Sequence, residues 1–68
     1  MQIIIGWDKD ISMFYAEIKA TATFFNIYMI TAIELVTLIK LLPGKKEVAF
    51  DPTLDAPDRA FILTQLSP

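Results

Sequence analysis

Two aspartates separated by one residue, Asp8 and Asp10, are the first side chains of this chain whose spacing could do chemistry. An Asp-x-Asp pair in a turn can offer carboxylate oxygens to a hard divalent cation such as calcium. A calcium loop needs several more acids at fixed offsets, and here Lys9 stands between the two carboxylates. We therefore expect both side chains to accept hydrogen bonds from amides of the turn, and we predict no metal.

Three further aspartates, Asp51, Asp55 and Asp58, surround two prolines near the C-terminal end of the sequence. They could join a metal site with Asp8 and Asp10 if the fold brought the two groups together. Their neighbouring prolines also make these positions typical of a turn followed by a helix start. We expect this second role, in which Asp51 begins a turn while Asp55 and Asp58 cap a short helix.

Glu34 is the one acidic residue that lies deep in an apolar stretch, where a buried carboxyl group could act as a general acid or base. Thr31 precedes it by three residues, and this Thr-x-x-Glu spacing is the capping box that begins many helices. The chain contains no histidine, no cysteine and no glycine-rich phosphate loop, so no nucleophile and base can be paired. We therefore predict a capping role for Glu34, no cofactor, and a protein that is not an enzyme.

The composition indicates more apolar surface than a small fold can hide. Hydrophobic residues make up 54% of the 68 residues. A domain of this size buries only about 60% of the surface that its unfolded chain exposes. No cysteine is present to form a stabilising disulfide. The remaining apolar surface is expected to contact another protein, a second copy of the chain, or lipid.

The charge balance argues against nucleic acid as a partner. Six basic and eight acidic residues give a formal net charge of −2, whereas nucleic-acid binding normally requires a basic surface. Residues 1–5 carry no basic side chain and only a short apolar run, which is unlike a signal peptide. These features predict a cytoplasmic protein.

The sequence predicts a single α+β domain over residues 1–68, and the order of apolar and turn-forming residues in the first half of the chain predicts its β part. The β-branched residues 3–5 and the apolar residues 11–18 flank an aspartate-rich turn, which favours an N-terminal β-hairpin. Residues 19–23 carry no strong turn signal. Residues 24–30 fit a third strand and part of a helix equally well, so the number of strands in this region stays open.

The second half of the chain is predicted to form two helices and one more strand. The capping box begins a helix over residues 31–42, which Pro43 and Gly44 end. Residues 48–50 fit a short strand, and residues 60–66 fit a short closing helix. The domain would therefore pack a hairpin, or three strands, against a capped helix and a short C-terminal helix.

An alternative interpretation treats residues 11–42 as one long helix. Residues 24–42 would be long enough to cross a bilayer, with residues from about 20 to 42 in the membrane. Asn26, Glu34 and Lys40 oppose this alternative, because polar and charged side chains are costly within a membrane. Seven apolar residues nevertheless recur at spacings of four and three, the pattern of a coiled-coil seam: Ile18, Ala22, Phe25, Met29, Ala32, Val36 and Ile39.

Trp7, beside the predicted hairpin turn, is a candidate contact with another protein, because tryptophan and tyrosine are enriched among the residues that dominate binding energy. Asp8 and Asp10 would form the polar rim of that contact, and Tyr28 would add a second aromatic anchor. We predict a non-catalytic protein-binding module that self-associates or docks on a partner protein. Small chains of this kind are often accessory subunits or inhibitors, including those that phages and mobile elements encode. The alternative is a single-span small subunit of a membrane complex.

Overall fold

A computed structural model describes residues 1–67 and confirms the predicted α+β class, with an N-terminal hairpin and a C-terminal helix. Within these residues, strands come first and helices follow. The elements are β1 (Gln2–Asp8), β2 (Met13–Ala20), β3 (Thr23–Met29), α1 (Ala32–Leu41), β4 (Glu47–Phe50) and α2 (Ala56–Leu66).

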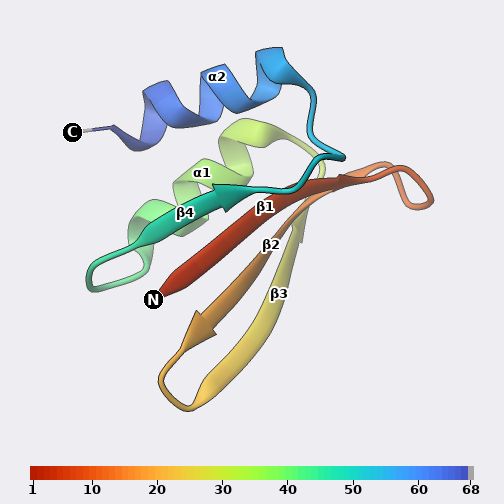
Figure 1. The fold of residues 1–68 in the computed structure, drawn as a ribbon. Helices are drawn as coiled ribbons and strands as arrows, with labels where there is room; N and C mark the ends of the chain where they lie inside the picture. The colour runs from red at the N-terminus through yellow and green to blue at the C-terminus, as the bar shows by residue number, and fades with distance from the viewer. Residues whose placement is uncertain (68) are drawn as a thin grey trace.

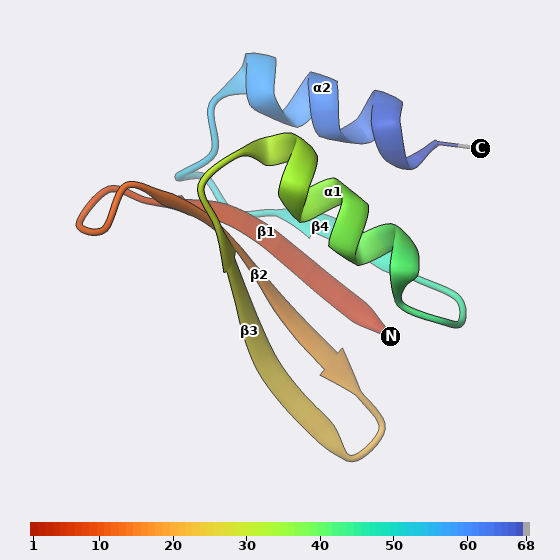
Figure 2. The ribbon, with the colours of Figure 1, turned by 180° about the vertical axis from the view of Figure 1, so that it is seen from behind.

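The four strands form one sheet in the order β3-β2-β1-β4. β1, β2 and β3 pair antiparallel, whereas β4 lies parallel to β1 after the chain crosses over through α1. Both helices lie on the same face of the sheet, as Figure 1 and Figure 2 show from opposite sides. No element of residues 1–67 covers the opposite face, which we call the open face.

The N-terminal hairpin is present, but its second strand begins later than predicted. The register pairs Asp8 with Met13, so residues 9–12 form the connection. Ser12 has a φ of 52°, a left-handed conformation that helps to close this loop. Ile11, which was expected in the second strand, therefore lies in the loop and is 52% exposed.

The ambiguous segment at residues 24–30 is a strand, β3. Its connection to β2 consists of Thr21 and Ala22 alone, because Ala20 pairs with Thr23. Neither connecting residue has a positive φ. The two-residue turns that are commonest in hairpins require a positive φ and therefore favour glycine or asparagine. This turn uses neither, which explains why residues 19–23 carry no turn signal.

The alternative of one long helix over residues 11–42 is wrong, because residues 13–20 and 23–29 of that span form the strands β2 and β3. α1 contains 10 residues and α2 contains 11. Neither of these described helices is long and apolar enough to span a bilayer. The seven apolar residues with spacings of four and three are therefore distributed over β2, β3, the connection between them and α1, and they do not form one coiled-coil seam.

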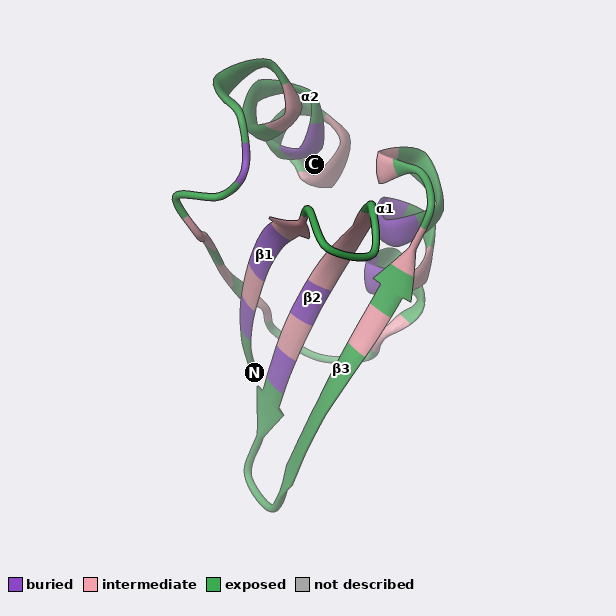
Figure 3. Ribbon diagram, turned by 90° about the vertical axis from the view of Figure 1, so that its right-hand side faces the viewer, coloured by how far each residue is buried: buried purple, intermediate pink, exposed green. Residues whose placement is uncertain are grey.

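The hydrophobic core lies between the sheet and the two helices. Alternate residues of β1 and β2 face it, since successive side chains of a strand point to opposite faces. In Figure 3 the buried segments form bands on β1, β2 and the helices, while β3 has no buried residue. The buried core residues are Ile3, Ile5, Ala16, Ile18, Leu35, Val36, Ile39, Leu54 and Ile62.

The two helices begin at the predicted kinds of residue, but only the first has a side-chain cap. Thr31 Oγ1 accepts a hydrogen bond from the Glu34 amide at 3.3 Å and donates one to Glu34 Oε1 at 2.7 Å. This confirms the capping role of Glu34, whose side chain is exposed. Asp55 occupies the N-cap position of α2 without a side-chain hydrogen bond to the helix, and Asp58 lies in the first turn. There the negative charge of Asp58 interacts favourably with the positive end of the helix dipole.

Candidate partner-binding site

The open face of the sheet carries aromatic and polar side chains that no helix covers. The register places one row across three strands that contains Gly6, Tyr15 and Tyr28. A second row contains Ile4, Glu17 and Asn26, and the row toward the tip of the β2–β3 hairpin contains Gln2, Lys19 and Phe24. Phe24 is 58% exposed and Tyr28 is 42% exposed. The open face therefore offers aromatic surface to a partner.

Two aromatic rings lie side by side on this face, toward the end of the sheet where β1 ends. The centroids of Tyr15 and Tyr28 are 6.5 Å apart, and the rings are tilted by 43°. The ring of Tyr15 also covers Gly6, in the space that a Cβ at this position would fill. The absence of a side chain at Gly6 therefore lets Tyr15 lie down on β1.

A hollow of about 460 Å³ opens where β1 ends, next to the ring of Tyr15. Trp7 forms one wall of it and packs edge-on against Phe14, with the ring centroids 4.8 Å apart. The Trp7 amide donates to Thr53 Oγ1 at 3.1 Å, which ties the β4–α2 loop to β1. The residues lining the hollow are Trp7, Asp8, Lys9, Asp10, Tyr15 and Thr53.

The structure brings together three of the four contact residues named from the sequence. Trp7, Asp8 and Asp10 line the hollow, while Tyr28 lies outside it with its ring against Tyr15. Trp7 is half-buried at the end of the core rather than fully exposed. The Asp10 amide donates to Asp8 Oδ1 at 3.0 Å, so Asp8 has the turn role that its position predicts.

Three residues of the hollow, Lys9, Tyr15 and Thr53, were not named as partner contacts from the sequence. Tyr15 lies within residues 11–18, which were predicted to form a strand, but its approach to Gly6 depends on the pairing register, which the sequence does not encode locally. Thr53 reaches Trp7 only because β4 pairs parallel to β1 and delivers its following loop to the same end of the sheet. The Asp51-Pro52 turn was the only signal for that loop.

Two side chains beside the hollow have shifted pKa values. Burial raises the pKa of the Tyr15 phenol, and the nearby negative charges of Asp51 and Glu17 act in the same direction. The Thr53 amide donates to Asp51 Oδ1 at 3.0 Å and lowers the pKa of that carboxyl group. At neutral pH, the hollow therefore has a neutral phenol in its lining and the ionised carboxylate of Asp51 close to that phenol.

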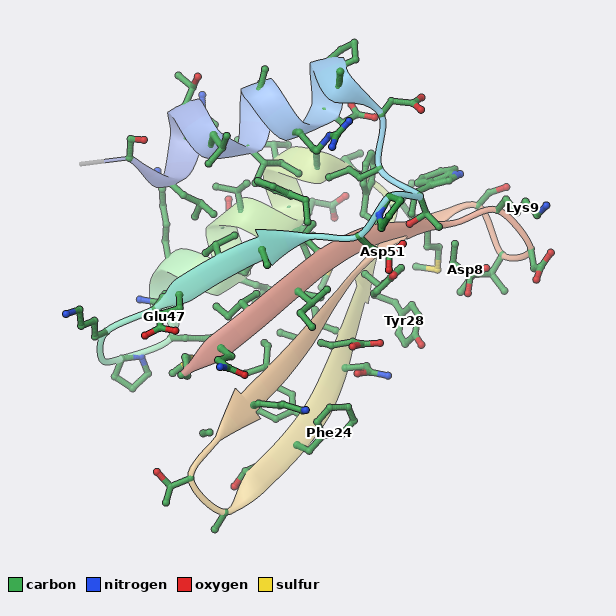
Figure 4. The ribbon with its side chains drawn as sticks, in the orientation of Figure 1. Asp8, Lys9, Phe24, Tyr28, Glu47 and Asp51 are labelled. Carbon is green, nitrogen blue, oxygen red and sulfur yellow. The ribbon has the colours of Figure 1, made fainter. Side chains whose placement is uncertain are left out.

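Charge is divided between the two ends of the sheet. Asp8 and Asp51 lie at the end with the hollow, together with Lys9 and Tyr28, as Figure 4 shows. A second hollow of about 290 Å³ adjoins Trp7 and is lined partly by Asp55 and Asp58. The hollow end therefore holds five of the eight acidic residues: Asp8, Asp10, Asp51, Asp55 and Asp58. Four of the six basic residues, Lys19, Lys40, Lys45 and Lys46, lie toward the opposite end.

The aspartates do not converge on one point, although they share this end of the sheet. No group of three acidic side chains in residues 1–67 is arranged to hold a metal ion. Comparison with family models, curated proteins and solved structures found no match. The geometry of the site is therefore the basis for inferring its function.

Proposed function

We propose that this chain is a non-catalytic protein-binding module that holds a basic segment of a partner protein at the acidic end of its open face. The observation that carries this proposal is the hollow at the end of β1, whose lining includes Tyr15 of the Tyr15–Tyr28 pair on the open face. An accessory subunit or an inhibitor acts in this way, by occupying part of its partner's surface.

Aromatic side chains supply the expected binding energy. Trp7, Tyr15 and Tyr28 are held in place by Phe14, Gly6 and each other, so little side-chain freedom is lost when a partner binds. Rigid aromatic anchors of this kind dominate the affinity of many protein interfaces. Trp7 and Tyr15 both line the hollow, so a partner side chain that enters it would contact both residues.

The charges around the hollow favour a basic partner. Asp8 and Asp10 outnumber Lys9 in its lining, and Asp51 lies next to Tyr15. A lysine or arginine side chain could pair with a carboxylate while it rests against an aromatic ring. Phosphate groups would be repelled at this end, which argues against nucleic acid as the ligand.

A random peptide library displayed on phage, selected against the folded chain, tests this proposal. We expect enriched peptides that are rich in lysine or arginine. Trp7 is the only tryptophan in the chain, so its fluorescence should change as a synthetic copy of such a peptide fills the hollow. Binding should weaken roughly tenfold or more in Tyr28→Ala, as is usual for an aromatic hot spot, and weaken also in Asp8→Asn.

Leu41→Ala is the matched control. Leu41 is exposed on α1, on the helix side of the sheet, so this variant should bind the peptide as the natural chain does. Failure to enrich any peptide would contradict the proposal. So would peptides whose affinity is unchanged in Tyr28→Ala and Asp8→Asn but reduced in Leu41→Ala.

A further inference from the structure

The outer edge of β3 lacks the features that usually protect an edge strand. β3 and β4 are the two edges of the sheet. β4 has only four residues, begins with Glu47 and is followed by Asp51 and Pro52, so charge and proline limit pairing on that side. β3 has seven residues, with the sequence TFFNIYM, and contains neither a charged residue nor a proline. It is the only strand of the sheet without a charged side chain.

The register shows which backbone groups β3 presents at this edge. A two-residue connection closes on a hydrogen-bonded pair, here Ala20 and Thr23. Hydrogen-bonded pairs then alternate along an antiparallel ladder. The N–H and C=O groups of Phe24, Asn26 and Tyr28 are therefore directed away from β2, toward the open edge.

We propose that β3 pairs antiparallel with β3 of a second copy of this chain, about a twofold axis at Asn26, so that two four-stranded sheets become one continuous sheet. Asn26 is the middle residue of the strand Thr23–Met29, so this register pairs all seven residues. The outward groups of Phe24, Asn26 and Tyr28 then face those of Tyr28, Asn26 and Phe24 in the second copy. The inference rests on the β3 edge and does not depend on the proposed function.

On the open face, this pairing extends the aromatic row. Tyr28 lies next to Tyr15 within one chain, and the second copy would add its Phe24 on the other side of Tyr28. Aromatic pairs across antiparallel strands stabilise a sheet. The central row would contain two neutral Asn26 side chains, flanked on each side by a Glu17 one strand away. No like charges would therefore stand directly opposite each other across the new strand pair.

On the helix side, the pairing places a poorly covered residue beside a covered one. Phe25 is 39% exposed, because the tip of the β2–β3 hairpin extends beyond the helices (Figure 1). Ile27 and Met29, toward the other end of β3, pack against the core. The twofold axis at Asn26 brings Phe25 of each copy opposite Ile27 of the other. Each chain would therefore cover apolar surface at the edge of its neighbour's hydrophobic core.

The test measures the mass of the chain in solution by light scattering, from low to high micromolar concentration. We expect the natural chain to convert from monomer to dimer. Asn26→Lys and Asn26→Glu should each remain monomeric, because each places two like charges opposite each other at the twofold axis. An equal mixture of the two variants should form a heterodimer, because opposite charges then face each other. Asn26 is exposed, and circular dichroism would check that both variants keep the fold.

Thr37→Lys is the control, since it adds the same charge at an exposed site of α1 and should leave dimer formation unchanged. Asn26 is used in preference to Tyr28 because Tyr28 also belongs to the proposed peptide site, and the Asn26 variants should still bind the selected peptides. A natural chain that stays monomeric at every concentration would overturn the inference. Dimers that persist unchanged in both Asn26 variants would overturn it as well.

Discussion

The ring of Tyr15 lies directly on Gly6, the residue opposite it on β1. Any side chain at position 6 would occupy the same space as that ring. Gly6 does not have a positive φ, so its backbone is one that alanine could adopt. The glycine is therefore explained by the contact with Tyr15, and this contact forms one wall of the hollow.

Gly6→Ala should destabilise the fold, because the new methyl group forces the Tyr15 ring away from β1. Overpacking of this kind typically costs about 1–3 kcal/mol. Urea unfolding, followed by the fluorescence of Trp7, would measure the change in the free energy of unfolding.

The same substitution in a Tyr15→Ala background should be neutral or slightly stabilising, because the ring is absent and alanine loses less backbone entropy than glycine. Equal costs of Gly6→Ala in both backgrounds would show that the Tyr15 contact does not determine the residue at position 6.

The Tyr15 phenol should ionise at a higher pH than an ordinary tyrosine, because burial raises its pKa. The chain has two tyrosines, so Tyr28→Phe leaves Tyr15 as the only phenol for an ultraviolet titration of the folded protein. Since the folded-state pKa lies above the unfolded value, this group contributes stability below the unfolded pKa. That stability is lost as the pH rises through the folded-state pKa. A titration at or below the ordinary tyrosine value would contradict the packing of Tyr15 over β1.

Asp51 should stabilise the β4–α2 loop only while it is ionised. Its carboxylate accepts the Thr53 amide at 3.0 Å, and its pKa is lowered. A lowered folded-state pKa contributes stability above the unfolded pKa, and that stability is lost as the pH falls through the folded-state pKa. The natural chain should therefore be more stable than Asp51→Asn at neutral pH, with the difference narrowing in acid. Thermal unfolding of both proteins across the acidic pH range would test this. A stability difference that stays constant with pH would show that the Asp51 carboxylate is not the cause of that difference.

Thr31→Ala should lower the free energy of unfolding by about 1 kcal/mol, because the first turn of α1 loses its side-chain cap. Thr37→Ala is the matched control: Thr37 bonds only to the Ile33 carbonyl within the same helix and is exposed. Urea unfolding should give a clearly lower free energy of unfolding for Thr31→Ala than for Thr37→Ala. Equal effects would mean that the Thr31–Glu34 capping box adds nothing to stability.

The sequence predicts elements well where a local signal marks their ends. The capping box at Thr31 and the Pro43-Gly44 pair delimited α1 to within a residue at each end. β3 could not be decided, because the Thr21-Ala22 turn uses ordinary backbone angles and therefore needs no glycine or asparagine. The apolar residues around that turn satisfy a helical spacing as well as a strand.

The site depends on pairings that the sequence does not encode locally. Trp7, Asp8 and Asp10 could be named because they are neighbours in the sequence, at the end of β1 and in the connection that follows it. The arrival of Thr53 beside Trp7 requires the parallel pairing of β4 with β1, and the contact of Tyr15 with Tyr28 requires the β2–β3 register. Composition alone predicted an apolar surplus, and the structure shows where it is exposed: on β3 at Phe24, Phe25 and Tyr28, and also on the two helices and in two connections.

The most direct test of the binding surface is a nuclear magnetic resonance titration of the isotope-labelled chain with a selected basic peptide. We predict that the largest shifts of backbone amides occur around the hollow and the aromatic pair, in residues 6–10, Tyr15, Tyr28 and Thr53. The amides of α1 and of the C-terminal half of α2 should move little, because those segments lie on the other side of the sheet. Largest shifts along the helices, with residues 6–10 and Tyr28 unchanged, would contradict the assignment of the open face as the partner-binding surface.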